Sequence, residues 1–134
     1  MNTEKYVKCN LSRKERSVLA QIRLGILPLK IETGRFENLL PENRLCEFCS
    51  NQTIEDEEHF LFKCELNREL RMKFMYTLQN RSTETISNES SSIILWKTLF
   101  ENPRQSSRYI ISAFENRRNH LYVSHKFNYI VQMF

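Results

Sequence analysis

Soft metal ligands are concentrated in one short segment, CEFCSNQTIEDEEHFLFKC, which spans residues 46–64 and holds three of the chain's four cysteines. The segment begins with a C-x2-C pair, Cys46 and Cys49, and ends with an H-x4-C pair, His59 and Cys64. Two thiolates at C-x2-C spacing can converge on one ion from a tight turn, and thiolate and imidazole are ligands that Zn²⁺ prefers. The spacing therefore predicts a zinc ion bound by these four residues.

Four protein ligands fill the tetrahedral shell of zinc and leave no position for water or substrate, so we predict a structural site. The sequence shows no H-E-x-x-H motif, glycine-rich phosphate loop or Ser-His-Asp set, and we expect no enzymatic activity. Buried free cysteines would be the alternative explanation, but a complete Cys-Cys-His-Cys set in so short a segment favours the metal. Cys9 is interpreted as an ordinary thiol, and His120 and His125 as helix residues.

The composition predicts a mainly α fold, a small helical domain organised around the CCHC zinc site with a long C-terminal helix. Only two glycines and three prolines occur in 134 residues, which favours helices over a sheet with tight glycine turns. Ser12 and Glu15 form a capping-box pattern before an expected helix over residues 13–26. Its apolar positions recur at helical spacing: Val18, Leu19, Ile22 and Ile26.

The helix that positions the second ligand pair is expected to begin at Thr53 and to carry His59 near its middle. On an ideal α-helix, residues five apart point about 140° away from each other. We therefore predict that the helix ends between His59 and Cys64, and that Cys64 reaches the ion from its terminus. One of the acids at positions 55–58 is a candidate to accept the imidazole N–H of His59.

The rest of the chain is expected to form three more helices and one loop. A helix over residues 66–78 would bury Leu66, Leu70, Phe74 and Leu78, and a polar flexible linker would follow at residues 80–92. A short helix should stop before Pro103, and a long one should run from Arg104 to the end. Its expected buried positions are Tyr109, Ile110, Ala113, Phe114, Leu121 and Tyr122. We predict two folded parts, residues 1–79 and 93–134, on either side of the linker.

Charge is distributed unevenly along the chain. Residues 1–45 and 73–134 each carry a net charge of +4, whereas residues 46–72 carry −4. This balance is compatible with a polyanionic partner without demanding one. The amino terminus lacks an apolar signal region and no apolar run is long enough to cross a bilayer, so no membrane association is expected. We predict an intracellular protein, nuclear or cytoplasmic, whose apolar end FNYIVQMF folds back or contacts a protein partner.

The segment RLCEFCSNQTIEDEEHFLFKCELNRELR, preceded by QIRLGILPLKIETGRF, resembles the C-terminal region of LINE-type (non-LTR) retrotransposon reverse transcriptases. The resemblance covers about residues 11–75, and it combines an R-x-C-x2-C segment, an acidic stretch before the histidine, and an arginine-bearing helix after the last cysteine. It implies a CCHC tail that helps the element's protein hold RNA or DNA. The F/Y-x-D-D polymerase core of that family is absent, so we expect a C-terminal fragment without polymerase activity.

The resemblance places the ligands at Cys46, Cys49, His59 and Cys64, and basic family positions at Arg23, Arg35, Arg44 and Arg71, so Arg71 is also expected to contact nucleic-acid phosphate. From the residues themselves, we expect phosphate contacts from Arg13, Arg16, Arg23, Lys30, Arg35 and Arg44. Phe48 in the C-x2-C turn is a candidate to stack on a base; its alternative role is to pack over the zinc. The alternative function is a zinc-stabilised protein-interaction module, since the metal segment itself is acidic.

Overall fold

The computed structural model of the chain describes residues 10–49, 51–79 and 92–132, with the side chains of α6 described as far as Leu121. The described part is mainly helical, as predicted, and its only β pairing is one bridge between Leu45 and Ile54. Cys9, most of the predicted linker and the side chains of Tyr122 and His125 lie outside it. Four longer helices are present: α2 (Arg13–Leu24), α4 (Arg68–Gln79), α5 (Ser92–Glu101) and α6 (Pro103–Gln132).

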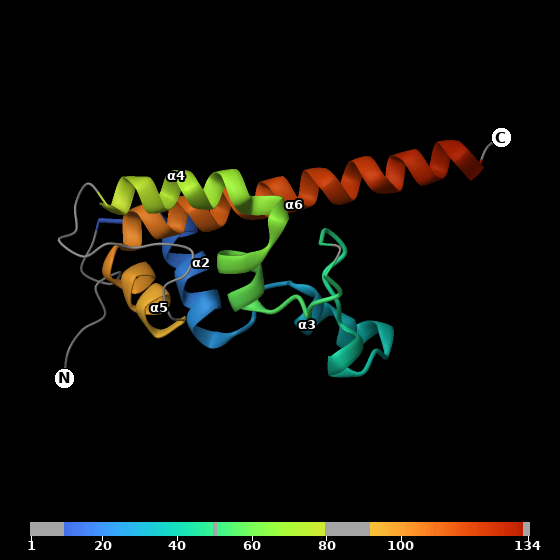
Figure 1. Cartoon of the computed structure of the whole chain (residues 1–134), viewed down its shortest axis with the longest axis horizontal. Helices are drawn as coiled ribbons and strands as arrows, with labels where there is room; N and C mark the ends of the chain where they lie inside the picture. Colours follow the sequence, from blue (N-terminus) through green and yellow to red (C-terminus); the bar gives the residue numbers. More distant parts are fainter. Residues whose placement is uncertain (1–9, 50, 80–91, 133–134) are drawn as a thin grey trace.

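The long helix α6 organises the molecule (Figure 1). Helices α2 and α4 pack along its first half on opposite sides, α5 also contacts α6, and the last turns of α6 extend beyond the other elements. One apolar core joins both halves of the chain, because Tyr109, Ile110 and Ala113 of α6 contact the cluster that includes Leu19 and Phe60. None of the described helices is long and apolar enough to span a membrane.

Helix α2 begins as its sequence predicts. The Ser12 hydroxyl accepts a hydrogen bond from the Glu15 amide at 3.1 Å, and the Glu15 carboxylate accepts one from the Ser12 amide at 3.0 Å. Its end was predicted two residues too late. Gly25 adopts a left-handed conformation with φ 68°, which terminates the helix at Leu24. Ile26 therefore lies outside the helix and is 50 % exposed instead of buried.

The later helices match the predicted pattern with small shifts at their starts. Helix α4 begins at Arg68 because a short 3₁₀ turn, η4 (Glu65–Asn67), precedes it; Phe74 and Leu78 are buried as predicted. Helix α5 ends at Glu101, and α6 begins at Pro103, whose missing N–H suits a first helical turn.

The helix predicted from Thr53 is shorter than expected. Residues 44–46 and 53–55 are paired in extended conformation, with the Cys46 amide donating to the Thr53 carbonyl at 2.8 Å and the Glu55 amide to the Arg44 carbonyl at 3.0 Å. This pairing occupies the backbone as far as Glu55, and the Asp56 amide then donates to the Ile54 carbonyl at 3.1 Å, which turns the chain. Helical structure begins at Glu57 and continues as the π-helical turn η3 (His59–Lys63).

Residues 30–43 form three short turns: α3 (Lys30–Thr33), η1 (Gly34–Glu37) and η2 (Pro41–Asn43). Arg44 holds this connector together. Its Nε donates to the Leu39 carbonyl at 3.1 Å and its Nη1 to the Ile31 carbonyl at 2.9 Å. The Arg44 side chain crosses Gly34 so closely that a Cβ there would lie 2.5 Å from Cγ.

Gly34→Ala is therefore expected to destabilise the protein by about 1–3 kcal/mol, because the stem of Arg44 must move and give up its two carbonyl contacts. Urea denaturation of the metal-loaded protein measures this. The control is Gly34→Ala in an Arg44→Ala background, where the space is open and the change should cost little. Equal costs in the two backgrounds would show that Arg44 is not the cause.

Candidate metal centre

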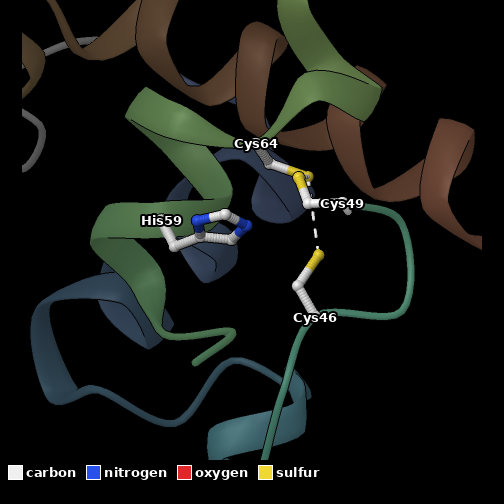
Figure 2. A group of neighbouring side chains, drawn as sticks. All are labelled: Cys46, Cys49, His59 and Cys64. Carbon is white, nitrogen blue, oxygen red and sulfur yellow. Dashed lines mark hydrogen bonds between the residues drawn. The ribbon is translucent and has the colours of Figure 1, made fainter. Parts of the chain in front are cut away.

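The four predicted ligands come together in the structure (Figure 2). Cys46 and Cys49 lie on the turn that follows η2, His59 opens η3, and Cys64 directly follows its last residue. We call these four residues the metal cluster. The imidazole of His59 points towards the three sulfurs, and one possible ligand atom from each residue lies within 4.8 Å of the others. The cluster is thus a group positioned to hold a metal ion.

The sulfur separations fit a tetrahedral shell. The Sγ atoms of Cys46 and Cys64 are 3.7 Å apart, and those of Cys49 and Cys64 are 3.6 Å apart. Zinc–sulfur bonds of about 2.3 Å at tetrahedral angles would place two sulfurs about 3.8 Å apart. These distances are far too long for a disulfide, in which the sulfurs are about 2 Å apart, and the three cysteines are free thiols. The spacing is therefore that of ligands around one ion.

The π-helical turn η3 explains why the second pair is spaced H-x4-C. The Cys64 amide donates to the His59 carbonyl at 2.7 Å, an i→i+5 bond that places Cys64 above His59 along the helix axis. The next backbone angles at Cys64, φ −65° and ψ 131°, are extended and end the helical turn. The prediction that the helix ends between His59 and Cys64 is confirmed, because η3 ends at Lys63, and its wider turn brings both side chains to one side.

Backbone amides offset the negative charge of the sulfurs, as expected for a metal-binding turn. The Phe48 amide donates to Cys46 Sγ at 3.4 Å and the Glu65 amide to Cys49 Sγ at 3.2 Å. The sulfurs of Cys46 and Cys49 therefore each receive an N–H, which favours the thiolate form that binds metal.

A hydrogen bond couples the sulfurs of Cys46 and Cys64. The hydrogen bond from the Cys64 thiol holds the pKa of Cys46 well below its usual range, with His59 and the Phe48 amide acting in the same direction against burial. The same contact, together with burial, raises the pKa of the Cys64 thiol. A divalent cation at this position would replace the proton of that hydrogen bond and stabilise both thiolates.

Both ring nitrogens of His59 are buried without a hydrogen-bond partner among the described residues. Because an unpaired buried polar atom costs free energy, this orphaned imidazole indicates a ligand that lies between it and the sulfurs. The expectation that an acid accepts the imidazole N–H is wrong for this structure. The nearby carboxylate of Asp56 accepts the backbone amide of His59 instead, at 2.8 Å, and so caps the start of η3.

Glu55, the first of the four acids, is 1 % exposed and serves the fold. Its Oε1 accepts the Lys30 amide at 2.7 Å and Arg117 Nη2 at 2.6 Å, and its Oε2 accepts Arg117 Nε at 3.1 Å. The acids at positions 55–58 therefore do not form a continuous exposed edge. Arg117 was not predicted from the sequence, because 62 residues separate it from its partner.

The ring of Phe48 packs against side chains of α6. The Arg117 guanidinium lies 5.6 Å from its ring centroid, and the His120 ring meets it edge-on at 6.4 Å. A groove of about 420 Å³ remains beside these rings, lined by Glu47, Phe48, Glu65, Leu66, His120 and Leu121. His120 is thus close to the cluster without belonging to it.

The predicted phosphate-binding residues fall into two groups. Arg13, Arg16, Arg23 and Arg35 are exposed, although Arg35 forms an ion pair with Glu32. The other three are engaged in the fold: Lys30 pairs with Glu37 and Glu47, Arg44 donates to backbone carbonyls, and Arg71 is only 5 % exposed. The structure therefore assigns interior roles to Arg44 and Arg71.

No family model matches the chain, and no significant match is found among characterised proteins or solved structures. The function of the chain is therefore inferred from the geometry of the site and from the surface around it.

Proposed function

We propose that this chain is a zinc-stabilised nucleic-acid-binding module that resembles the C-terminal tail of a LINE-type reverse transcriptase and has no polymerase activity of its own. The observation that carries the proposal is the convergence of three sulfurs and an unpartnered buried imidazole within 4.8 Å. A closed set of three thiolates and one imidazole suits tetrahedral Zn²⁺ and leaves no site for catalysis. Reduced thiols also suit an intracellular location, nuclear or cytoplasmic.

The nucleic-acid part of the proposal is supported by exposed cations on two neighbouring helices. Helix α2 carries Arg13, Arg16 and Arg23 on its exposed side. Helix α6, which packs against α2, adds three more exposed cations: Arg104, Arg108 and Arg118. A grouping of this kind attracts phosphates and releases the counterions around them. Lys30, Arg44 and Arg71, which the fold engages, are left out of the proposed surface.

The test is fluorescence anisotropy with zinc-loaded protein and short labelled strands of RNA, single-stranded DNA and duplex DNA over a range of salt concentrations. We expect micromolar binding that weakens as salt rises. The triple variant Arg13→Gln, Arg16→Gln, Arg23→Gln should bind less tightly and reduce the log–log salt slope by about 2–3, because each lost phosphate contact removes about 0.7–0.9.

The matched control removes three exposed cations elsewhere, at Lys63, Arg68 and Lys73, which lie on η3 and α4. In Figure 1, α4 lies on the opposite side of α6 from α2. The control carries the same net charge as the triple variant and should retain most of the affinity. Equal losses in both variants would argue for net charge alone, and no salt-sensitive binding at micromolar protein would reject the nucleic-acid proposal.

A second candidate function, a zinc-stabilised protein-interaction module, is favoured by large apolar side chains on the surface. Phe36 is 82 % exposed, Leu24 69 % and Leu40 60 %. Patches of exposed apolar side chains mark protein contacts when they are contiguous. The apolar end of α6, predicted as a partner surface, lies where that helix extends beyond the other elements. A purified partner complex that survives nuclease treatment would favour this function over the first.

A further inference from the structure

Arg71 is a buried cation without a carboxylate partner in the part of the chain that the structure describes. It lies in the first turns of α4, 5 % exposed, and its Nε and Nη1 atoms have no hydrogen-bond partner among the described residues. None of the ion pairs among the described residues includes Arg71. A buried charge is tolerated when an opposite charge compensates it. The position of Arg71 therefore calls for a nearby anion.

A chain of contacts connects Arg71 to the metal cluster. Helix α4, which carries Arg71, contacts η3, and Phe74, one turn after Arg71, stacks on Tyr109. The Tyr109 hydroxyl donates to the backbone carbonyl of Leu61, inside the turn η3 that joins His59 to Cys64. The ring of Tyr109 is fixed by stacking on Phe74, with centroids 4.7 Å apart.

The pKa of the Tyr109 hydroxyl depends on both Arg71 and Cys64. Burial raises the pKa of its hydroxyl, the Arg71 cation opposes this, and the Cys64 sulfur adds to it. Arg71 and Cys64 thus act on the same buried atom with opposite sign. In an environment screened from water, opposite charges at this range stabilise each other more than they would at the surface.

We propose that Arg71 is the counter-charge of the metal centre, a positioning residue that balances the site and raises its metal affinity. This inference rests on the proposed zinc site. A divalent cation bound by three thiolates and a neutral imidazole leaves one net negative charge, and Arg71 supplies one positive charge without contacting solvent. Tyr109, which packs against the same helix, donates to the Leu61 carbonyl in the middle of η3 and so supports the turn that holds Cys64 beside His59.

The test is the zinc dissociation constant, measured by competition with a chromophoric chelator. Arg71→Met keeps an unbranched side chain without the charge, and we expect its dissociation constant to rise about 10–100-fold, as is usual when an outer partner of a metal site is lost. Arg71→Lys retains the charge and should stay within a few-fold of the natural protein. Tyr109→Phe removes only the hydroxyl that supports η3 and should give an intermediate rise.

A charge cycle separates this role from a merely structural one. Cys49→His converts the site to two thiolates and two imidazoles, which zinc also accepts, and makes the metal centre neutral. In that background Arg71→Met should cost far less zinc affinity. If the Arg71→Met single variant fails to fold with zinc, the double variant should still fold. The proposal is overturned if Arg71→Met leaves the zinc affinity unchanged, or if Arg71→Lys and Arg71→Met lose equal affinity. It is also overturned if Arg71→Met costs the same affinity in both backgrounds. Absence of zinc binding in the unaltered protein would instead reject the proposed function.

Discussion

Removal of the metal is expected to unfold the middle of the molecule, from about residue 41 to residue 70. Structural zinc in small modules contributes about 10–16 kcal/mol at neutral pH, which is comparable to the whole stability of a domain. The loss should spread into the core, because Phe60, Leu61 and Phe62 of η3 are at most 5 % exposed and pack with residues of α2 and α6. Circular dichroism and thermal melting before and after chelation measure the change, and metal analysis should give one zinc per chain.

The matched variants are Cys64→Ala and Cys9→Ala. Cys64 is 0 % exposed at the centre of the cluster, and its loss removes the sulfur shared by both other cysteines, so the variant should show a melting temperature close to that of the chelated protein. Cys9, interpreted as an ordinary thiol, should leave both metal content and melting temperature unchanged. An unaltered protein that keeps its melting temperature after complete chelation would contradict the structural role of the metal.

The features that were predicted well from the sequence depend on residues that lie close together in the chain. The capping box of Ser12 and Glu15 spans one helical turn, and C-x2-C spacing confines two sulfurs to one tight loop. Both are therefore decided by local geometry. The π turn is an intermediate case. An α-helix cannot place residues five apart on one side, so the H-x4-C spacing of His59 and Cys64 contained the signal for a wider turn, which our prediction resolved by ending the helix early.

Residues of α6 support the turn η3 through contacts that could not be predicted, because no sequence periodicity links residues so far apart in the chain. Tyr109 donates to the Leu61 carbonyl across 48 residues, and Asn116 donates to Asn67 Oδ1 across 49. Asn67, 0 % exposed, in turn donates to the Phe60 carbonyl. These side chains satisfy carbonyls that the short helical turn leaves without partners. Arg71, which was predicted to contact phosphate, is buried by long-range packing of the same kind.

Glu55→Ala is expected to destabilise the zinc-loaded protein by about 3–5 kcal/mol, a fall in melting temperature of about 10–20 °C. The Glu55 carboxylate accepts two hydrogen bonds from Arg117, whose side chain is 12 % exposed, and a third from the Lys30 amide. Truncation would leave a buried guanidinium and a buried amide unpaired. Urea denaturation with saturating zinc measures the loss apart from any change in metal occupancy.

The double variant Glu55→Met, Arg117→Met distinguishes the cost of an unpaired charge from the value of the pair itself. Replacing both partners by apolar side chains removes the charges together, so most of the stability lost in Glu55→Ala should return. Glu32→Ala is the surface control, since its partner Arg35 has a side chain that is 57 % exposed and exposed pairs contribute about 1 kcal/mol or less. If Glu55→Ala lowered the stability no more than Glu32→Ala does, the buried pair of Glu55 and Arg117 would not be what holds α6 to the segment before η3.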